Sequence, residues 1–237
     1  MEPYPYSWIT EGIVVATWAF APWLIFVIMR ESGRSLATSW LFFAITAGWA
    51  ILAWLIVRTE RLTGAGLFAE ALPLIILISA VLITTIFAKV IVGQGLNQRW
   101  LIGLQLFRAI GMVFVLEWSR GNLPAIFALP AGWGDLATAL VALAVLLIYR
   151  RGAIPKPAIY TVAAVGILDA ISAFFFGFLS SPTNLQLFAF DQPNQVAAYP
   201  TGLIPYFLIT FAVLFHILSL TEAQRATQVT AKAKVAA

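Results

Sequence analysis

The sequence contains no cysteine and a single histidine, and charged residues occupy only 10% of its 237 positions. Without cysteine there are no disulfides, thiol nucleophiles or thiolate metal sites, and one histidine is too few for bis-histidine haem ligation. Soluble domains carry about 25% charged residues, so this chain cannot cover a water-exposed surface. We therefore expect neither a soluble fold nor a metal site.

Hydrophobic residues are abundant instead, at 62% of the chain, and they recur in runs of a length that can cross a membrane. We expect an all-α protein with one domain of seven transmembrane helices over residues 1–220 and a short cytoplasmic tail over 221–237. The N-terminal segment carries two glutamates and lacks a basic region, so the first run is predicted to be a permanent span. The expected spans cover about residues 8–30, 36–58, 68–92, 100–119, 129–150, 157–179 and 201–220.

Lysines and arginines predict the orientation of these spans, because basic loops remain in the cytoplasm. Ten of them fall on one side of the expected bundle and three on the other, while Arg108 lies within a span. The bias favours an N-terminus outside and a C-terminus in the cytoplasm. Because the basic residues are spread over several loops, they explain the net charge of +4 without a nucleic-acid partner.

Arg108 is the most informative residue, since it is predicted about halfway across the fourth span. An isolated arginine at that depth costs about 2.5–3.5 kcal/mol, so it needs a partner or water. Asp169 in the sixth span is expected at a similar depth. Gln105 and Ser172 lie three residues from Arg108 and Asp169, on the same helical faces.

Two interpretations of this polar site remain open. Ionisable residues inside a membrane usually mark a substrate or proton pathway. A single balanced pair of charges, however, also resembles a structural ion pair that sets how two helices pack.

Four carboxylates are predicted at the outer ends of spans, at Glu11, Glu70, Glu117 and Asp135. Together they can form an outer vestibule that attracts cations, or each can simply lie in the headgroup region near a helix N-terminus. His216, near the inner end of the last span, is either a proton carrier or a packing residue.

The stretch between the fourth and fifth spans, "GNLPAIFALPAGWGD", is too apolar for an ordinary loop and rich in proline and glycine. We expect a short interfacial or re-entrant turn there, followed by Asp135 as the N-cap of the fifth span. The segment from Gln105 through "RAIGMVFVLEWSRGNLPAIFALPAGWGDLATALVALA" resembles a set of uncharacterised bacterial integral-membrane proteins. That resemblance implies the bacterial inner membrane and no particular activity.

The sequence lacks the motifs of a membrane hydrolase, so we expect a protein that is not an enzyme. The leading hypothesis is a transport protein that binds or passes a small solute, ion or proton through the buried polar site. The alternative is an accessory or scaffold subunit, or a homo-oligomer, that binds lipid, quinone or carotenoid noncovalently. In both cases the lipid bilayer is the expected partner.

Overall fold

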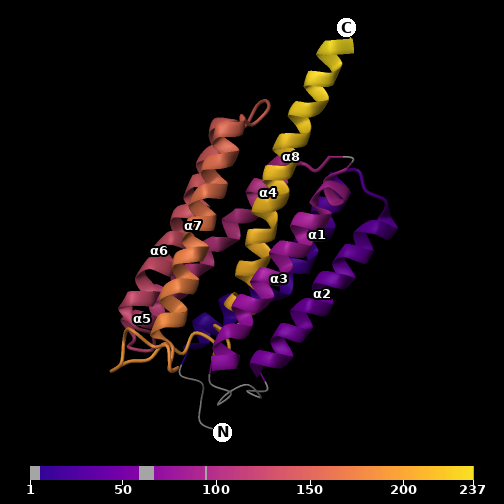
Figure 1. Cartoon of the computed structure of the whole chain (residues 1–237). Helices are drawn as coiled ribbons and strands as arrows, with labels where there is room; N and C mark the ends of the chain where they lie inside the picture. Colours follow the sequence, from indigo (N-terminus) through magenta and orange to yellow (C-terminus); the bar gives the residue numbers. More distant parts are fainter. Residues whose placement is uncertain (1–5, 59–66, 94, 237) are drawn as a thin grey trace.

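The computed structural model describes residues 6–58, 67–93 and 95–236. Within these ranges the chain is helical and has no strand. Figure 1 shows the helices packed side by side, with the described chain beginning and ending at opposite ends of the bundle. Their bounds are α1 Trp8–Glu31, α2 Leu36–Arg58, α3 Leu67–Val92, α4 Gln98–Gly103, η1 Leu104–Gly111, α5 Met112–Ser119, α6 Ala125–Ile148, α7 Lys156–Ser180, η2 Ile204–Leu208 and α8 Ile209–Ala236.

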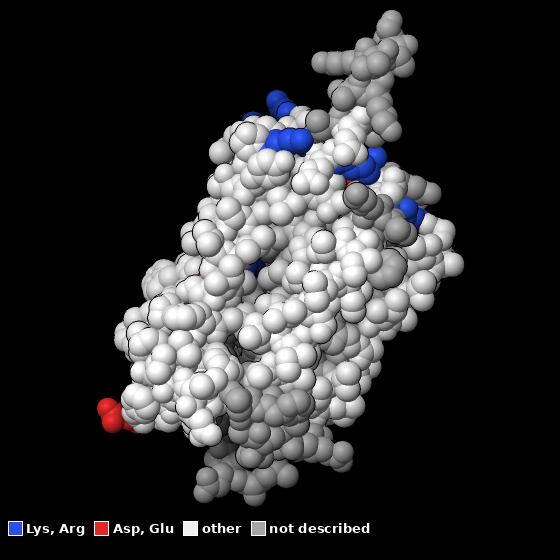
Figure 2. All heavy atoms as spheres, in the orientation of Figure 1, with Lys and Arg blue, Asp and Glu red and all other residues white. Residues whose placement is uncertain are grey.

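Six of the helical segments are long and apolar enough to cross a membrane: α1, α2, α4 to α5 with η1 between them, α6, α7, and η2 with α8. In the described part of α3, the apolar stretch is shorter and covers Ala71–Ile86. Figure 2 shows a broad, almost entirely white belt, with blue lysines and arginines at the end reached by α8 and one red acidic group at the opposite end. This arrangement supports a transmembrane protein.

The helix boundaries follow from local capping and turn chemistry. Ser7 caps α1 by accepting a hydrogen bond from the backbone N–H of Thr10, and Pro124 and Pro155 stand immediately before α6 and α7. After α5 the chain turns at Gly121, whose φ of 77° suits glycine. These signals separate consecutive helices by short connections.

Helix α8 lies inside the bundle and is the most buried of the six candidate spans, whereas α2 is the least buried. Helix α8 packs against α3, α4 and α7. The π-helix η2 at its start contacts α1, α2 and α3. Helix α6 packs against η1, α5 and α7. At its other end α8 continues as a helix through the expected tail and extends beyond the bundle.

The predicted broken stretch before the fifth span is the main difference from expectation. Helix α6 begins at Ala125, directly after Pro124, and runs through Pro130 and both glycines of "GWG". Pro130 lies in the second turn, where its missing N–H removes only one hydrogen bond of a helix held by its neighbours. The prediction of a re-entrant turn is therefore wrong, and α6 starts earlier than expected.

Candidate functional site

Arg108 is buried at the centre of the bundle and is bound by two carboxylates. Its Nε donates to Asp135 Oδ1 on α6 at 2.6 Å, and its Nη2 donates to Asp169 Oδ2 on α7. Its Nη1 donates to the carbonyl oxygen of Gly166 on α7 at 2.8 Å. One guanidinium thus joins η1, α6 and α7. We refer to Arg108, Asp135 and Asp169 as the buried ionic cluster.

The structure places Asp135 differently from the sequence prediction. Asp135 lies near the middle of α6, so it is not the N-cap of that helix and not an outer carboxylate. The error follows from the predicted start of the span, because beginning the helix at Ala125 moves Asp135 more than two turns into it. Arg108 therefore has two acidic partners, where the sequence analysis proposed one.

Two departures from α-helical geometry face each other beside the cluster. Arg108 lies on η1, a 3-10 helix, and η2 at the start of the last span is a π-helix. A small space between them is lined by Arg108, Asp135, Ile204 and Leu208. Such interruptions are uncommon inside long helices and occur often at functional sites. The cluster thus lies where the backbone of two spans is irregular.

Three glycines leave the space that the buried polar side chains occupy. A Cβ added to any of them would overlap the carboxylate or imidazole of a residue on the neighbouring helix. A side chain larger than hydrogen therefore cannot fit at these positions unless the polar group moves away. The pairs are Gly111 with Asp135, Gly134 with Asp169, and Gly166 with His216.

The other predicted polar residues fall into two groups. Gln105 is buried and donates through Nε2 to the carbonyl oxygen of Ala212 at 3.2 Å, while the half-buried Ser172 makes no hydrogen bond to the cluster in the described structure. Among the described residues, Gln105 Oε1, Asp169 Oδ1 and His216 Nε2 are buried without a hydrogen-bond partner. These atoms add unused hydrogen-bonding capacity to the region of Arg108.

The cluster is not electrically balanced when both of its acids are ionised. Arg108 supplies one positive charge, whereas Asp135 and Asp169, which are both bound to it, supply two negative charges. His216 packs against Gly166, whose carbonyl oxygen accepts a hydrogen bond from Arg108. Among the side chains that the structure describes, no three histidine or carboxylate groups are placed to share a metal ion. One further positive charge would balance the cluster.

Glu117, predicted at the outer end of the fourth span, is buried and fully engaged. Its carboxylate accepts hydrogen bonds from the N–H of Ser7 at 3.2 Å, from the hydroxyls of Ser7 and Thr10, and from Asn122 Nδ2 at 2.6 Å. It therefore ties the start of α1 to the end of α5. These contacts indicate a structural role for this carboxylate.

The other three carboxylates of the expected outer vestibule are placed differently from one another. Glu11 is exposed and accepts a hydrogen bond from the Tyr199 hydroxyl at 2.9 Å. The side chain of Glu70 lies outside the described part of the structure. Since Asp135 is in the middle of α6, the prediction of an outer vestibule formed by all four carboxylates is wrong.

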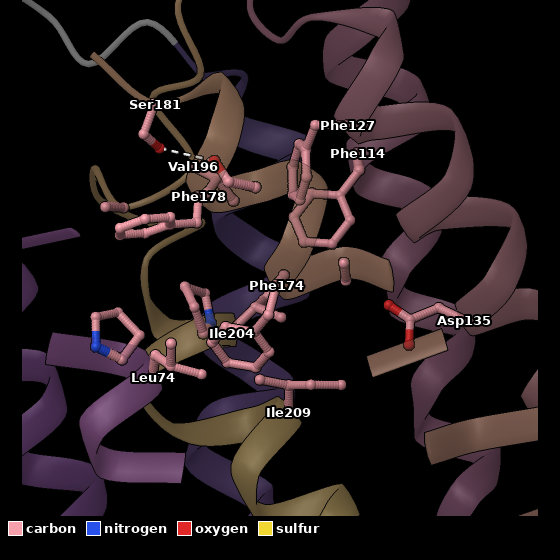
Figure 3. Close-up of a pocket in the computed structure, with 15 residues that line it drawn as sticks. Leu74, Phe114, Phe127, Asp135, Phe174, Phe178, Ser181, Val196, Ile204 and Ile209 are labelled. Carbon is pink, nitrogen blue, oxygen red and sulfur yellow. Dashed lines mark hydrogen bonds between the residues drawn. The ribbon is translucent and has the colours of Figure 1, made fainter. Parts of the chain in front are cut away.

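An apolar cavity of about 70 Å³ adjoins the cluster. Figure 3 shows Asp135 on one side of it, across from Leu74 and Phe178, with Phe114 and Phe127 close to each other on a third side. Val196 and Ala197, from the segment that connects α7 to η2, also line it. Asp135 thus belongs both to the cluster and to the wall of the cavity.

Comparison with known proteins identifies a family. The model of a family described as a domain of unknown function, DUF8737, matches residues 67–222. The chain belongs to this family. The matched residues run from the start of α3 to α8 and include Arg108, Asp135, Asp169 and His216, whereas α1 and α2 lie outside them. No curated protein and no solved structure matches the chain.

Proposed function

We propose that the buried ionic cluster binds one exchangeable proton and that the protein uses this site to pass protons, or a small solute coupled to them, across a membrane. The observation that carries the proposal is the contact of one guanidinium with two carboxylates in the middle of the helix bundle. An unbalanced charge in a medium of low dielectric is costly, and a proton is the smallest ion that removes it. Two carboxylates that are held close together commonly share one proton.

The surroundings of the cluster favour exchange of this proton over permanent neutralisation. Asp169 Oδ1 and His216 Nε2 are buried atoms that can accept or donate a hydrogen bond and, among the described residues, make none. Asp135 lines the adjoining cavity, so its carboxylate is accessible from that space. A purely structural ion pair needs neither of these features.

Counting bound protons tests the proposal. In lipid nanodiscs, potentiometric titration of the wild type is expected to show about one proton bound by the cluster, and Asp135→Asn or Asp169→Asn about none, because one arginine then faces one acid. Arg108→Gln is expected to bind about two. Asp191→Asn, in an exposed loop, is the matched control for the loss of a carboxylate. The infrared carbonyl band of a protonated carboxylic acid identifies the site.

An unchanged proton count in the two asparagine variants would contradict the proposal. If folded Asp135→Asn and Asp169→Asn proteins bind as many protons as the wild type, the cluster is an ion pair with no proton and the proposal is wrong. Size-exclusion chromatography separates this outcome from loss of the folded state.

We further propose that the chain crosses a bacterial inner membrane seven times, with α3 as the additional span and the C-terminus in the cytoplasm. The distribution of basic residues supports this orientation, since Arg30, Arg99 and Arg151 lie at the end of the bundle reached by α8. Because the chain has no cysteine, single cysteines report sidedness without background. In intact cells a membrane-impermeant maleimide is expected to label Asn184→Cys, and to label Ala153→Cys only after permeabilisation; the reverse pattern would contradict the orientation.

A second candidate is an accessory subunit or homo-oligomer that binds lipid, quinone or carotenoid. The apolar cavity favours it, because its described lining is aliphatic and aromatic except for Asp135 and Ser181. A coloured or quinone-containing extract of the purified protein, together with a cluster that binds no exchangeable proton, would favour this candidate over the first.

A further inference from the structure

The cavity beside Asp135 continues into a groove that opens on the side of the bundle. The groove runs between α3 and α7 and shares Leu74, Phe174 and Phe178 with the cavity. Helices α3 and α7 touch each other little, whereas both pack against α8, which therefore forms the base of the groove. Exposed Ile78 and Ile171 flank the opening. Figure 2 shows the white surface hollowed on this face.

The groove and the cavity differ in chemistry along their length. The groove is lined by apolar residues and lies between two apolar helices, so a hydrocarbon chain is a compatible occupant. At the inner end, the described lining of the cavity contains one charged group, the carboxylate of Asp135. Arg108 is not part of this lining, and its guanidinium is directed to Asp135, Asp169 and the carbonyl oxygen of Gly166. The cavity thus presents negative charge.

Aromatic rings surround the same space. Phe114, Phe127, Phe174 and Phe178 line the cavity together with Asp135, and Figure 3 shows these rings around the space into which the carboxylate points. The faces of aromatic rings attract organic cations, most strongly where the contact is desolvated. Ring faces and a carboxylate together select a quaternary or protonated amine over an anion.

From these observations we infer that the site binds a lipophilic organic cation. Its apolar chain lies in the groove between α3 and α7, and its ammonium group contacts Asp135 among the phenylalanine rings. The cation enters sideways from the lipid layer and takes the place of the proton in the cluster. The inference rests on the proposed function, because exchange of one cation for another requires the unbalanced charge of the cluster.

Three probes with the same chain test the inference on wild-type protein in neutral-lipid nanodiscs. Dodecyltrimethylammonium is expected to raise the unfolding temperature and to release about one proton per bound molecule. Dodecanol, which has the chain without the charge, and dodecyl phosphate, which has the opposite charge, are expected to release none. Proton release is followed with a pH indicator in weakly buffered solution.

A pair of variants locates the binding site. Ala173 lines the cavity, whereas Ala164 is exposed on the same helix. Ala173→Phe is expected to fill the cavity and abolish proton release by dodecyltrimethylammonium, and Ala164→Phe is expected to leave it unchanged. Ala164→Phe is also expected to keep the proton count of the wild type, and the proton count of Ala173→Phe is measured alongside to separate loss of the proton from loss of cation binding.

Two results with the wild-type protein would overturn the inference while the proposed function stands. One is a titrating proton that dodecyltrimethylammonium does not release, and the other is equal proton release by dodecanol. Unchanged release in folded Ala173→Phe would also overturn it, because the cation then binds elsewhere. Absence of any titrating proton in the cluster would instead contradict both the proposed function and the inference.

Discussion

Replacing Gly134 by alanine tests how the buried ionic cluster is held. Gly134 on α6 faces Asp169 on α7, and an added Cβ would overlap Asp169 Oδ1 and lie 2.6 Å from its Cγ and 3.2 Å from its Cβ. Two helices that pack directly cannot absorb such an overlap unless they separate or Asp169 moves away from Arg108. The added methyl group is therefore expected to weaken the ion pair between Arg108 and Asp169 without changing either residue.

The loss of stability in Gly134→Ala can be bounded from these two responses, separation of the helices and movement of Asp169. Inserting a methyl group into a packed interior costs about 1–3 kcal/mol, and removing one partner of a buried ion pair costs about 3–5 kcal/mol. Because Arg108 keeps Asp135 as a partner, we expect less than the full loss of an ion pair. The expected decrease in unfolding free energy is about 2–3 kcal/mol. Gly48→Ala is the control, since no atom lies within 4 Å of its added Cβ, and it is expected to change stability by about 1 kcal/mol or less.

Reversible unfolding in mixed micelles, followed by circular dichroism, measures these differences. A double-mutant cycle with Asp169→Ala sharpens the test, because truncating the aspartate removes the clash and Gly134→Ala should then cost much less. If Gly134→Ala is as stable as the wild type, or if its cost is the same with and without Asp169, then the close contact between α6 and Asp169 does not hold the cluster and the reasoning is wrong.

Three further predictions address the surroundings of the cluster. Gly166→Ala is expected to displace His216 and to cost about 1–3 kcal/mol in the same unfolding assay; an unchanged unfolding curve would contradict that contact. Glu117→Gln replaces one carboxylate acceptor with an amide and is expected to cost about 1–3 kcal/mol, with faster proteolysis near the start of α1; an unchanged cleavage rate would contradict its role in tying α1 to α5. Arg225→Ala breaks a pair with Glu222 near the surface and is expected to cost less than about 1 kcal/mol, so a larger loss would indicate a role that this ion pair does not explain.

The contact of Arg108 with Asp169 illustrates how far sequence reasoning reaches. Both residues stand inside apolar runs of known length, and counting helical rise from the same side of the membrane places them at similar depth. The structure joins them directly. Depth along a helix is local information, so it can be derived from spacing alone.

Asp135 shows where the same reasoning fails. Its depth depends on where α6 begins, and the proline and glycine residues of "LPAIFALPAGWGD" favoured a break that the helix does not have. A signal was present, because Asp135 lies at helical spacing from the small residues Ala131, Thr138 and Ala142, all of which are buried. A stripe of small side chains in an apolar helix indicates close packing against a neighbour and argues against a loop.

The sequence by itself determined the all-helical architecture, the approximate positions of six long apolar helices and the need of Arg108 for an acidic partner, because run length, hydropathy and charge are properties of neighbouring residues. Only the tertiary structure decided that a second carboxylate joins the cluster, that glycines make room for it and that an apolar cavity ends at Asp135. These features depend on which faces of α6, α7 and α8 meet. That choice is made by packing between different helices, which no local pattern encodes.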